Sequence, residues 1–372
     1  MSPDSPAHRD NNFDALRIAA ALMVVIGHAY ILSGRIEIEP LVRSTGIAGF
    51  GELGVSMFFV ISGFLVASSY LRLSSLRSYL LNRCLRIVPA LTVAALLTAL
   101  VLGPAVTTLE TDAYFSRPQT WLYPLRNVLL YPVTYALPGV FETNPYPAVA
   151  NGSLWTLRLE FSLYLVLPLL AAVRLLNRRG LAAVALIALG AYFSVLAVGP
   201  SRAPPIVLVG VRNGYLFLAG AALFVWRDCL RPQRLAVLAP ALGLFLLGAA
   251  FDRTAPLVAM PLLPVVTVGL GLHAIRGLSG PPRFGDLSYG VYIYAFPVQQ
   301  ALIQSFGPER LSVGGFFGLT LAAVLPLAAA SWWLVERPAL KWKRFGRPRA
   351  TGPGRREEYA PIESAAGTAP TP

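Results

Sequence analysis

Long apolar stretches interrupted by few charges are the feature that most limits how this chain can fold. Only 13% of its 372 residues are charged and 55% are hydrophobic, whereas a soluble globular domain carries about 25% charged residues. A chain this poor in charge cannot cover a water-facing surface of its own size. The composition therefore excludes a mostly disordered chain, a disulfide-rich secreted scaffold and an ordinary cytosolic enzyme. It predicts a protein that crosses a membrane several times.

Ten stretches are long and apolar enough to be predicted as transmembrane helices, since a spanning helix needs about 20 mostly apolar residues. They lie near residues 14–34, 51–70, 86–107, 154–174, 181–199, 205–226, 235–250, 255–275, 287–306 and 315–335. Residues 108–153 are predicted to form an excursion on the outer side, because prolines interrupt the apolar part at 121–140. The sequence leaves open whether that part is re-entrant or interfacial. The predicted fold is an all-α polytopic membrane protein with about ten transmembrane helices.

The distribution of positive charge predicts the orientation of these helices. If the N-terminus is cytoplasmic, most of the 31 Lys and Arg residues fall on the inner side, as the positive-inside rule requires. Both termini are then cytoplasmic. The net charge of +13 is explained by topology, so no nucleic-acid partner is predicted. The chain divides into a polar tail at 1–12, a membrane domain at 13–345, and a tail at 346–372 that is predicted to be disordered.

The first predicted span contains three ionisable residues, Asp14, Arg17 and His28. A charged group is costly in the hydrocarbon of a membrane, so each one suggests a functional site. Arg17 and His28 are eleven residues apart, which places them on one helix face and about 16 Å apart along its axis. His28 then lies in the outer half of the bilayer. Alternatively, Arg17 is a headgroup anchor paired with Asp14, and His28 is a hydrogen-bonded contact between helices.

Glu160 and Arg212 are predicted to lie at the depth of His28. Each follows the outer end of its span by about 10 Å, and this common depth suggests a shared polar chamber. A carboxylate behind a neutral histidine is a general-base arrangement. The alternative is a structural ion pair between Glu160 and either Arg212 or Arg158.

Arg83 and Arg86 lie one helical turn apart near the inner start of the third span, on one face of the helix. Two arginines placed in this way can bind phosphate groups or anchor the helix at lipid headgroups. Glu336 ends the last span among basic residues and can pair with its neighbours. The sequence contains no zinc signature, P-loop, GxSxG motif or dinucleotide fingerprint, so no metal site is predicted.

Six short motifs in order resemble the acyltransferase-3 family of integral membrane acyltransferases over about residues 11–345. They are Arg17 with His28 eleven residues later, the glycine- and phenylalanine-rich segment 51–64, Arg83-Cys-Leu-Arg-Ile-Val-Pro89, Ser153-Leu-Trp-Thr-Leu-Arg-Leu-Glu160, Gly285-Asp-Leu-Ser-Tyr-Gly-Val-Tyr292 and Val335-Glu-Arg-Pro338. Many family members have a histidine shortly after the fifth motif, where this chain has Ala295-Phe296-Pro297. No second catalytic histidine is therefore predicted there.

The resemblance implies a membrane O-acyltransferase that moves an acyl group, often acetyl, from cytoplasmic acyl-CoA to a hydroxyl of an extracytoplasmic or lipid-linked carbohydrate. It also implies a location in the bacterial inner membrane. His28 becomes the general base or a transient acyl carrier, Glu160 its supporting carboxylate, and Arg17 a group that holds the donor. The further implied roles are donor-phosphate binding by Arg83 and Arg86, acceptor binding by Trp155, Arg212 and Tyr292, and support by Asp14 and Glu336.

A membrane transporter or flippase for a lipid-linked sugar or acid is the competing interpretation. Ten spans, buried charges and the proline-interrupted stretch at 256–264 also suit transport. Several aromatic residues of the outer excursion add a second open question, because they can stack on sugar faces or form an interfacial belt. These residues are Tyr114, Trp121, Tyr123 and Tyr135.

Overall fold

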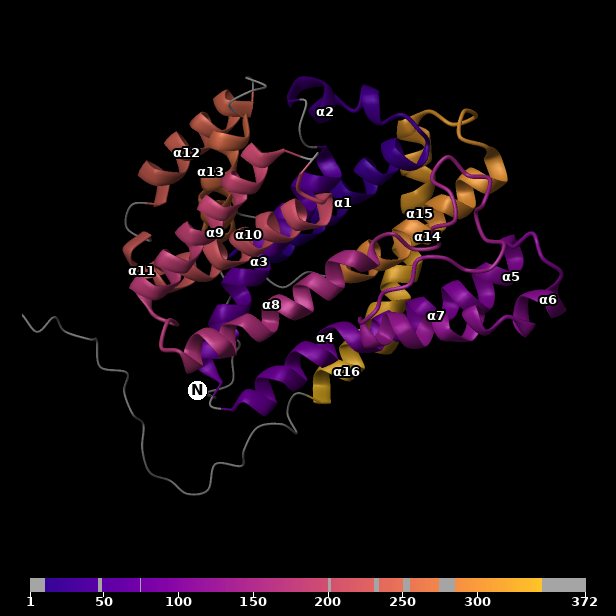
Figure 1. Ribbon diagram of the computed structural model, residues 1–372, viewed down its shortest axis with the longest axis horizontal. Helices are drawn as coiled ribbons and strands as arrows, with labels where there is room; N and C mark the ends of the chain where they lie inside the picture. Colours follow the sequence, from indigo (N-terminus) through magenta and orange to yellow (C-terminus); the bar gives the residue numbers. More distant parts are fainter. Residues whose placement is uncertain are drawn as a thin grey trace, which may run out of the picture.

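The computed structural model describes residues 11–45, 49–73, 75–199, 202–230, 234–249, 255–273 and 285–342. Within these ranges every regular element is a helix, and the one isolated β-bridge pairs Thr107 with Val140. Figure 1 shows long helices packed side by side, with α12 and α13 at the opposite end of the molecule from α5 and α6. The predicted disordered tail at 346–372 lies outside the described residues, as do the first ten residues of the N-terminal tail.

The long helices coincide with the ten predicted spans. They are α1 (Phe13–Leu32), α3 (Phe50–Arg72), α4 (Leu76–Leu97) with a π-helical turn (Thr98–Leu102) and α5 (Gly103–Val106), α8 (Leu154–Ala172), α9 (Arg178–Val198), α10 (Pro205–Val225), α12 (Arg234–Ala249), α13 (Ala255–Leu272), α14 (Ser288–Phe306), and α15 (Val313–Ser331) with a second π-helical turn (Trp332–Glu336) and α16 (Arg337–Lys341). The short helices are a 3₁₀ turn (Ile36–Ile38), α2 (Pro40–Thr45), α6 (Thr111–Ser116), α7 (Pro118–Leu129) and α11 (Arg227–Leu230). Among the described residues, seven helices are long and apolar enough to cross a membrane. A polytopic membrane protein is confirmed, while the count of ten and the cytoplasmic termini stay predictions.

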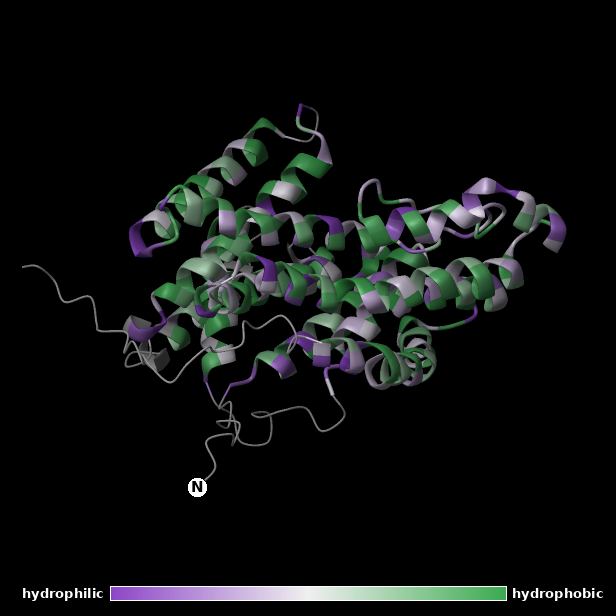
Figure 2. Ribbon diagram, turned by 90° about the horizontal axis from the view of Figure 1, so that it is seen from below, coloured by the Kyte–Doolittle hydropathy of each residue, from purple (hydrophilic) through white to green (hydrophobic). Residues whose placement is uncertain are grey.

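Apolar side chains cover the outside of the helix bundle as well as its interior. Figure 2 shows hydrophobic colouring along the helices and hydrophilic colouring mainly at their ends and connections. Leu169, Leu186, Ile187 and Ile206 are 65–71% exposed. In water such large apolar residues on several helices would be unfavourable, whereas lipid tails solvate them. The outer surface of the bundle is therefore apolar, as contact with a lipid bilayer requires.

Helices α1 and α3 approach each other closely where two glycines meet. A Cβ atom on Gly27 would collide with the backbone of Gly51, and small residues are the usual means by which membrane helices approach each other. At the other end of the pair, the rings of Phe13 and Phe64 lie 5.0 Å apart between centroids. The two helices are therefore antiparallel, with the start of α1 beside the later turns of α3.

The excursion at 108–153, which is predicted to lie on the outer side, first folds back along α4. Helix α7 packs on α4 and its π-helical turn, and the chain then turns at Leu130, where φ is +64°. It returns to the end of α5, where Val140 pairs with Thr107. Because the segment leaves and rejoins the bundle at the same level, α7 does not cross to the other side. This path favours the re-entrant alternative for residues 121–140.

The second half of the excursion descends along α14. The Asn144 side-chain amide donates to the Gln300 side-chain carbonyl at 2.9 Å, and the Thr156 and Tyr292 hydroxyls lie 2.6 Å apart. The partners on α14 thus move eight residues toward its start, which corresponds to about 12 Å along the helix. Helix α8 therefore begins deep within the bundle, and the prediction that it enters at the outer surface is wrong.

The glycine contact between α1 and α3 leads to a test of the fold. Gly27→Val places a branched side chain against the backbone of Gly51, so we expect thermal unfolding in detergent at a lower temperature, with a loss of about 1–3 kcal/mol. Gly190→Val on α9 is the matched control, because nothing lies within 4 Å of a Cβ atom there. Equal unfolding temperatures for the two variants would contradict the packing described here.

Candidate functional site

One carboxylate joins two arginines where α1, α4 and the start of α14 meet. Asp286 has its Oδ2 atom 2.5 Å from Nη1 of Arg17 and 2.5 Å from Nη2 of Arg86. Its Oδ1 atom accepts a hydrogen bond of 2.6 Å from the Ser288 hydroxyl. The three charged side chains are 12–19% exposed. Asp286 therefore holds both guanidinium groups in place and links the two helices that carry them.

The two guanidinium groups also control the protonation of Asp286. Burial alone would raise the pKa of this carboxyl group, but the charges of Arg17 and Arg86 and the hydrogen bond from Ser288 hold its pKa well below the usual range. A carboxyl group with a lowered pKa is ionised at neutral pH. Asp286 is thus a fixed negative charge between the two arginines.

Glu336 adds a second acidic group to Arg86. Its Oε2 atom lies 4.0 Å from Nη1 of Arg86, and its Oε1 atom accepts a hydrogen bond of 3.1 Å from Ser331. Glu336 closes the π-helical turn after α15 and is 2% exposed. The interpretation that Glu336 pairs with its sequence neighbours is wrong, because its ion pair reaches a residue on α4.

Arg83 differs from Arg86 because no salt bridge joins it to an acidic residue in the described part of the chain. Its Nη2 atom donates to the Ser69 hydroxyl at 3.3 Å, and its Nε atom is buried without a hydrogen-bond partner. The guanidinium carbon lies 5.8 Å and 5.5 Å from the ring centroids of Tyr79 and Tyr164. Cation–π contacts orient a guanidinium group without neutralising it. Arg83 therefore retains both its charge and an unused donor.

Glu160 hydrogen-bonds to Ser62 and Tyr164. The Ser62 hydroxyl donates to Oε1 of Glu160 at 3.0 Å, and the Tyr164 hydroxyl, one turn further along α8, donates to the same oxygen. Tyr164 in turn lies under the guanidinium group of Arg83. Among the described residues no hydrogen bond joins Glu160 to His28. The carboxylate is thus connected to the arginine side of the site.

The predicted common depth of Glu160 and His28 is wrong. Ser62, the partner of Glu160, is eleven residues beyond Gly51 on α3, which corresponds to about 16 Å along the helix. Gly51 lies beside Gly27 and hence beside His28. The cause of the error is the deep start of α8, which carries Glu160 toward the end of the bundle where Arg17 lies.

His28 stands apart from the arginine cluster, near the other end of α1. Its ring meets the ring of Phe296 edge-on, with centroids 5.1 Å apart and an interplanar angle of 84°. Its Nδ1 atom is buried and has no hydrogen-bond partner among the described residues. An imidazole with an unused ring nitrogen has the chemistry of a proton acceptor. No described carboxylate forms a salt bridge with it.

Arg212 forms a salt bridge with Glu52 on α3. Glu52 follows Gly51, so this pair lies near the level of His28. The alternative of an ion pair between Arg212 and Glu160 is therefore wrong, whereas the shared level of Arg212 and His28 is found. Sequence reasoning did not single out Glu52, although it lies within the glycine-rich motif at 51–64.

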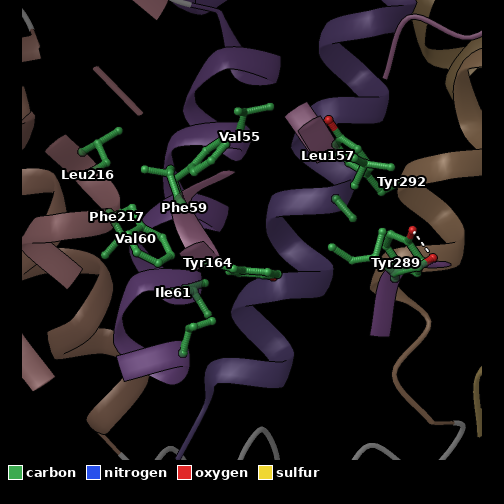
Figure 3. Close-up of a cluster of buried hydrophobic side chains, with 14 of the residues drawn as sticks. Val55, Phe59, Val60, Ile61, Leu157, Tyr164, Leu216, Phe217, Tyr289 and Tyr292 are labelled. Carbon is green, nitrogen blue, oxygen red and sulfur yellow. Dashed lines mark hydrogen bonds between the residues drawn. The ribbon is translucent and has the colours of Figure 1, made fainter. Parts of the chain in front are cut away.

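Tyr292 and Trp155 lie between the arginine cluster and His28. Tyr292 is 7% exposed, and its hydroxyl is engaged by Thr156 and by the Ser153 carbonyl. It holds the start of α8 against α14, so its position does not favour the predicted contact with an acceptor. Figure 3 shows Tyr292 with Tyr164 among the buried apolar side chains. Trp155 is half-buried against the same cluster.

The remaining predicted residues fall in different environments. Tyr114 and Tyr123 are fully buried. The alternative in which they stack on sugar faces is therefore wrong, because no ring face is open. Trp121 is 55% exposed on α7. Asp14 lies in the first turn of α1, three residues before Arg17.

The fold and the site together define an integral membrane protein. Its described helices form a bundle that buries an arginine cluster at one end and a histidine near the other. A family model described as an acyltransferase domain matches residues 10–335. The chain belongs to this acyltransferase-3 family, which confirms the resemblance drawn from the motifs. It is an acyltransferase of the non-aminoacyl type, and the transporter interpretation is not supported.

Two relatives match over most of both sequences. An O-acetyl transferase of Shigella phage Sf6 is 30% identical over 342 residues, covering 89% of this chain and 96% of the relative. Nodulation protein 10 of Rhizobium leguminosarum bv. viciae is 31% identical over 364 residues, covering 91% and 95%. No solved structure matches the chain.

The arginine cluster leads to a test of Asp286. Asp286→Asn removes the charge that faces Arg17 and Arg86, and breaking a buried ion pair costs about 3–5 kcal/mol. We expect a clear fall in the thermal unfolding midpoint. Asp228→Asn is the control, because Asp228 pairs with Arg227 at the surface with a side chain that is 56% exposed, and such pairs contribute about 0–1 kcal/mol. Equal effects would show that Asp286 does not hold the cluster together.

Proposed function

We propose that this protein moves an acyl group, in the first instance acetyl, from cytoplasmic acyl-CoA to a hydroxyl of an extracytoplasmic or lipid-linked carbohydrate. The observation that carries the proposal is the placement of Arg17 and His28 on one helix, about 16 Å apart along its axis. The long pantetheine arm of coenzyme A suits a path between a phosphate site and a distant reactive group. The name O-acetyl transferase, given to the phage relative, supports the acetyl group.

Arg83 is the residue that we propose for the donor phosphates. Its guanidinium group has no carboxylate partner among the described residues, whereas Arg86 faces Asp286 and Glu336. A cation whose charge is not offset binds a phosphate most strongly. Arg17 and Arg86 then frame the donor site with guanidinium groups that Asp286 has already positioned.

Glu160 takes a different role from the one predicted from sequence. Its carboxylate accepts a hydrogen bond from the Tyr164 hydroxyl, and the Tyr164 ring lies under the guanidinium group of Arg83. We assign Glu160 as a positioning residue for the donor side, acting through Tyr164. The ring of His28 is instead positioned by its packing against Phe296.

His28 performs the chemical step. Its imidazole takes the proton of the acceptor hydroxyl as the hydroxyl oxygen attacks the thioester carbonyl carbon. The carbon–sulfur bond then breaks, and the leaving thiolate takes the proton from the imidazolium. The products are an ester and free coenzyme A. Transfer through an acyl-histidine is the alternative route, in which the imidazole nitrogen itself attacks the thioester.

The proposed orientation follows from the same assignment. Donor binding at Arg83 requires the arginine end of the bundle to face the cytoplasm, as the distribution of positive charge predicts. His28 and the excursion then face the outer side of a bacterial inner membrane, where the acceptor carbohydrate is met.

The role of His28 is tested by His28→Ala in purified protein reconstituted in lipid nanodiscs. We expect transfer of radiolabelled acetyl groups from acetyl-CoA to fall about 10²–10⁴-fold, the usual contribution of a general base, while acetyl-CoA binding is retained. His273→Ala is the control and keeps full activity, because His273 follows the end of α13 and has no role in the proposed step. Undiminished transfer by the His28 variant would overturn the proposed mechanism.

The contrast between the two arginines is tested by calorimetry. Arg83→Gln removes a charge-assisted contact worth about 1.5–3 kcal/mol, so we expect the Kd for acetyl-CoA to rise at least tenfold with little change in thermal stability. Arg86→Gln leaves Glu336 without its ion-pair partner and Asp286 with Arg17 alone, so we expect a lower unfolding temperature. A wild-type Kd for Arg83→Gln would return Arg83 to the role of a lipid anchor.

A further inference from the structure

Tyr146, an exposed residue of the 108–153 excursion, is separated from the His28 imidazole by a single ring, that of Phe296. The ring of Phe296 lies 5.1 Å from His28 and 6.0 Å from Tyr146 between centroids, edge-on to both, with interplanar angles of 84° and 79°. Phe296 is 4% exposed, whereas Tyr146 is 41% exposed. Tyr146 therefore offers an open aromatic surface close to the proposed catalytic base.

The loop that carries Tyr146 is held firmly by α14. The fully buried side chain of Gln300 donates from Nε2 to the carbonyl oxygens of Tyr146 and Val149, at 2.7 Å and 3.0 Å. The Asn144 amide donates to the carbonyl oxygen of the same glutamine side chain at 2.9 Å. Residues on both sides of Tyr146 are thus bound to one helix, and a side chain on such a loop has little freedom to lose on binding.

Tyr135 is the second open tyrosine beside this loop. It is 36% exposed, and its carbonyl oxygen accepts a hydrogen bond of 2.7 Å from the backbone of Ala150. Burial raises the pKa of its hydroxyl, while Arg158 lowers it and Tyr146 adds to the rise. The backbone hydrogen bond from Ala150 places Tyr135 beside the loop that carries Tyr146, which Gln300 anchors through Val149.

We propose that Tyr146, together with Tyr135, forms the subsite that binds a pyranose ring of the acceptor and presents one of its hydroxyls to His28. A pyranose has an apolar face of C–H groups and a rim of hydroxyls. A tyrosine offers a flat apolar face and a hydroxyl that hydrogen-bonds, so it matches both. This inference rests on the proposed function, and it names the residues that recognise the ring form of the acceptor.

The test compares ring and open-chain acceptors. Purified full-length protein in nanodiscs receives radiolabelled acetyl-CoA and, in separate reactions, glycerol or the methyl pyranosides of glucose, galactose, mannose and N-acetylglucosamine. We expect Tyr146→Ala to lower kcat/KM about tenfold for the pyranosides that the wild type uses, the size expected for one lost stacking contact. Transfer to glycerol should stay within about twofold, since an open chain has no face to stack.

Further variants separate ring recognition from folding. Tyr146→Phe keeps the aromatic face and should retain pyranoside transfer, whereas Tyr146→Leu keeps an apolar side chain but has no aromatic face and should lose the preference. Phe306→Ala is the control, because Phe306 is an exposed aromatic residue at the end of α14 that contacts neither tyrosine ring in the part described. Retained acetyl-CoA binding checks that each variant is folded.

The outcomes distinguish this inference from the proposed function. If Tyr146→Ala leaves the ratio of pyranoside to glycerol transfer unchanged, or if the wild type acetylates glycerol but no pyranoside, the subsite is overturned and the acyltransferase mechanism stands. If the wild type transfers acetyl groups to none of these hydroxyls, the proposed carbohydrate acceptor is overturned, and the subsite with it.

Discussion

The ion pairs between one carboxylate and two arginines are the interaction on which the rest of the site depends. Arg17, Arg86 and Asp286 come from three parts of the chain that are far apart in sequence, and each would be costly in a membrane interior without the others. Together they fix the start of α1 against α4 and α14. Because α1 also carries His28, the same contact sets where the imidazole stands relative to Phe296 on α14.

This arrangement divides the molecule into two chemical regions joined by one helix. The cationic region holds Arg83, which no described carboxylate pairs with, beside the two carboxylates that neutralise Arg86. The histidine region has no such cluster, and the only charged pair found near His28 in the described structure is Arg212 with Glu52. A donor with charged and reactive ends far apart fits this division. Under the proposed function, this division separates donor recognition at Arg83 from proton transfer at His28.

Much of the fold follows from the sequence, because hydropathy reports directly on lipid exposure. The ten apolar stretches all form helices, and the spacing of Arg17 and His28 places both on α1 as predicted. The depth of Glu160 did not follow, because it depends on the descent of the excursion along α14 through Asn144 and Gln300. Contacts between such distant segments leave no periodic signal. Asp286 lay within a recognised motif, but its partner Arg17 is 269 residues away.

Under the proposed function, one donor molecule reaches from the arginine cluster to His28. The most direct measurement is a cryo-electron microscopy structure of the protein in nanodiscs with a non-hydrolysable acetyl-CoA analogue. We expect phosphate density within hydrogen-bond distance of Arg83 and the acetyl end beside the His28 imidazole. Phosphate density at the His28 end, or an acetyl group that stops beside Glu160 and Ser62, would contradict this expectation.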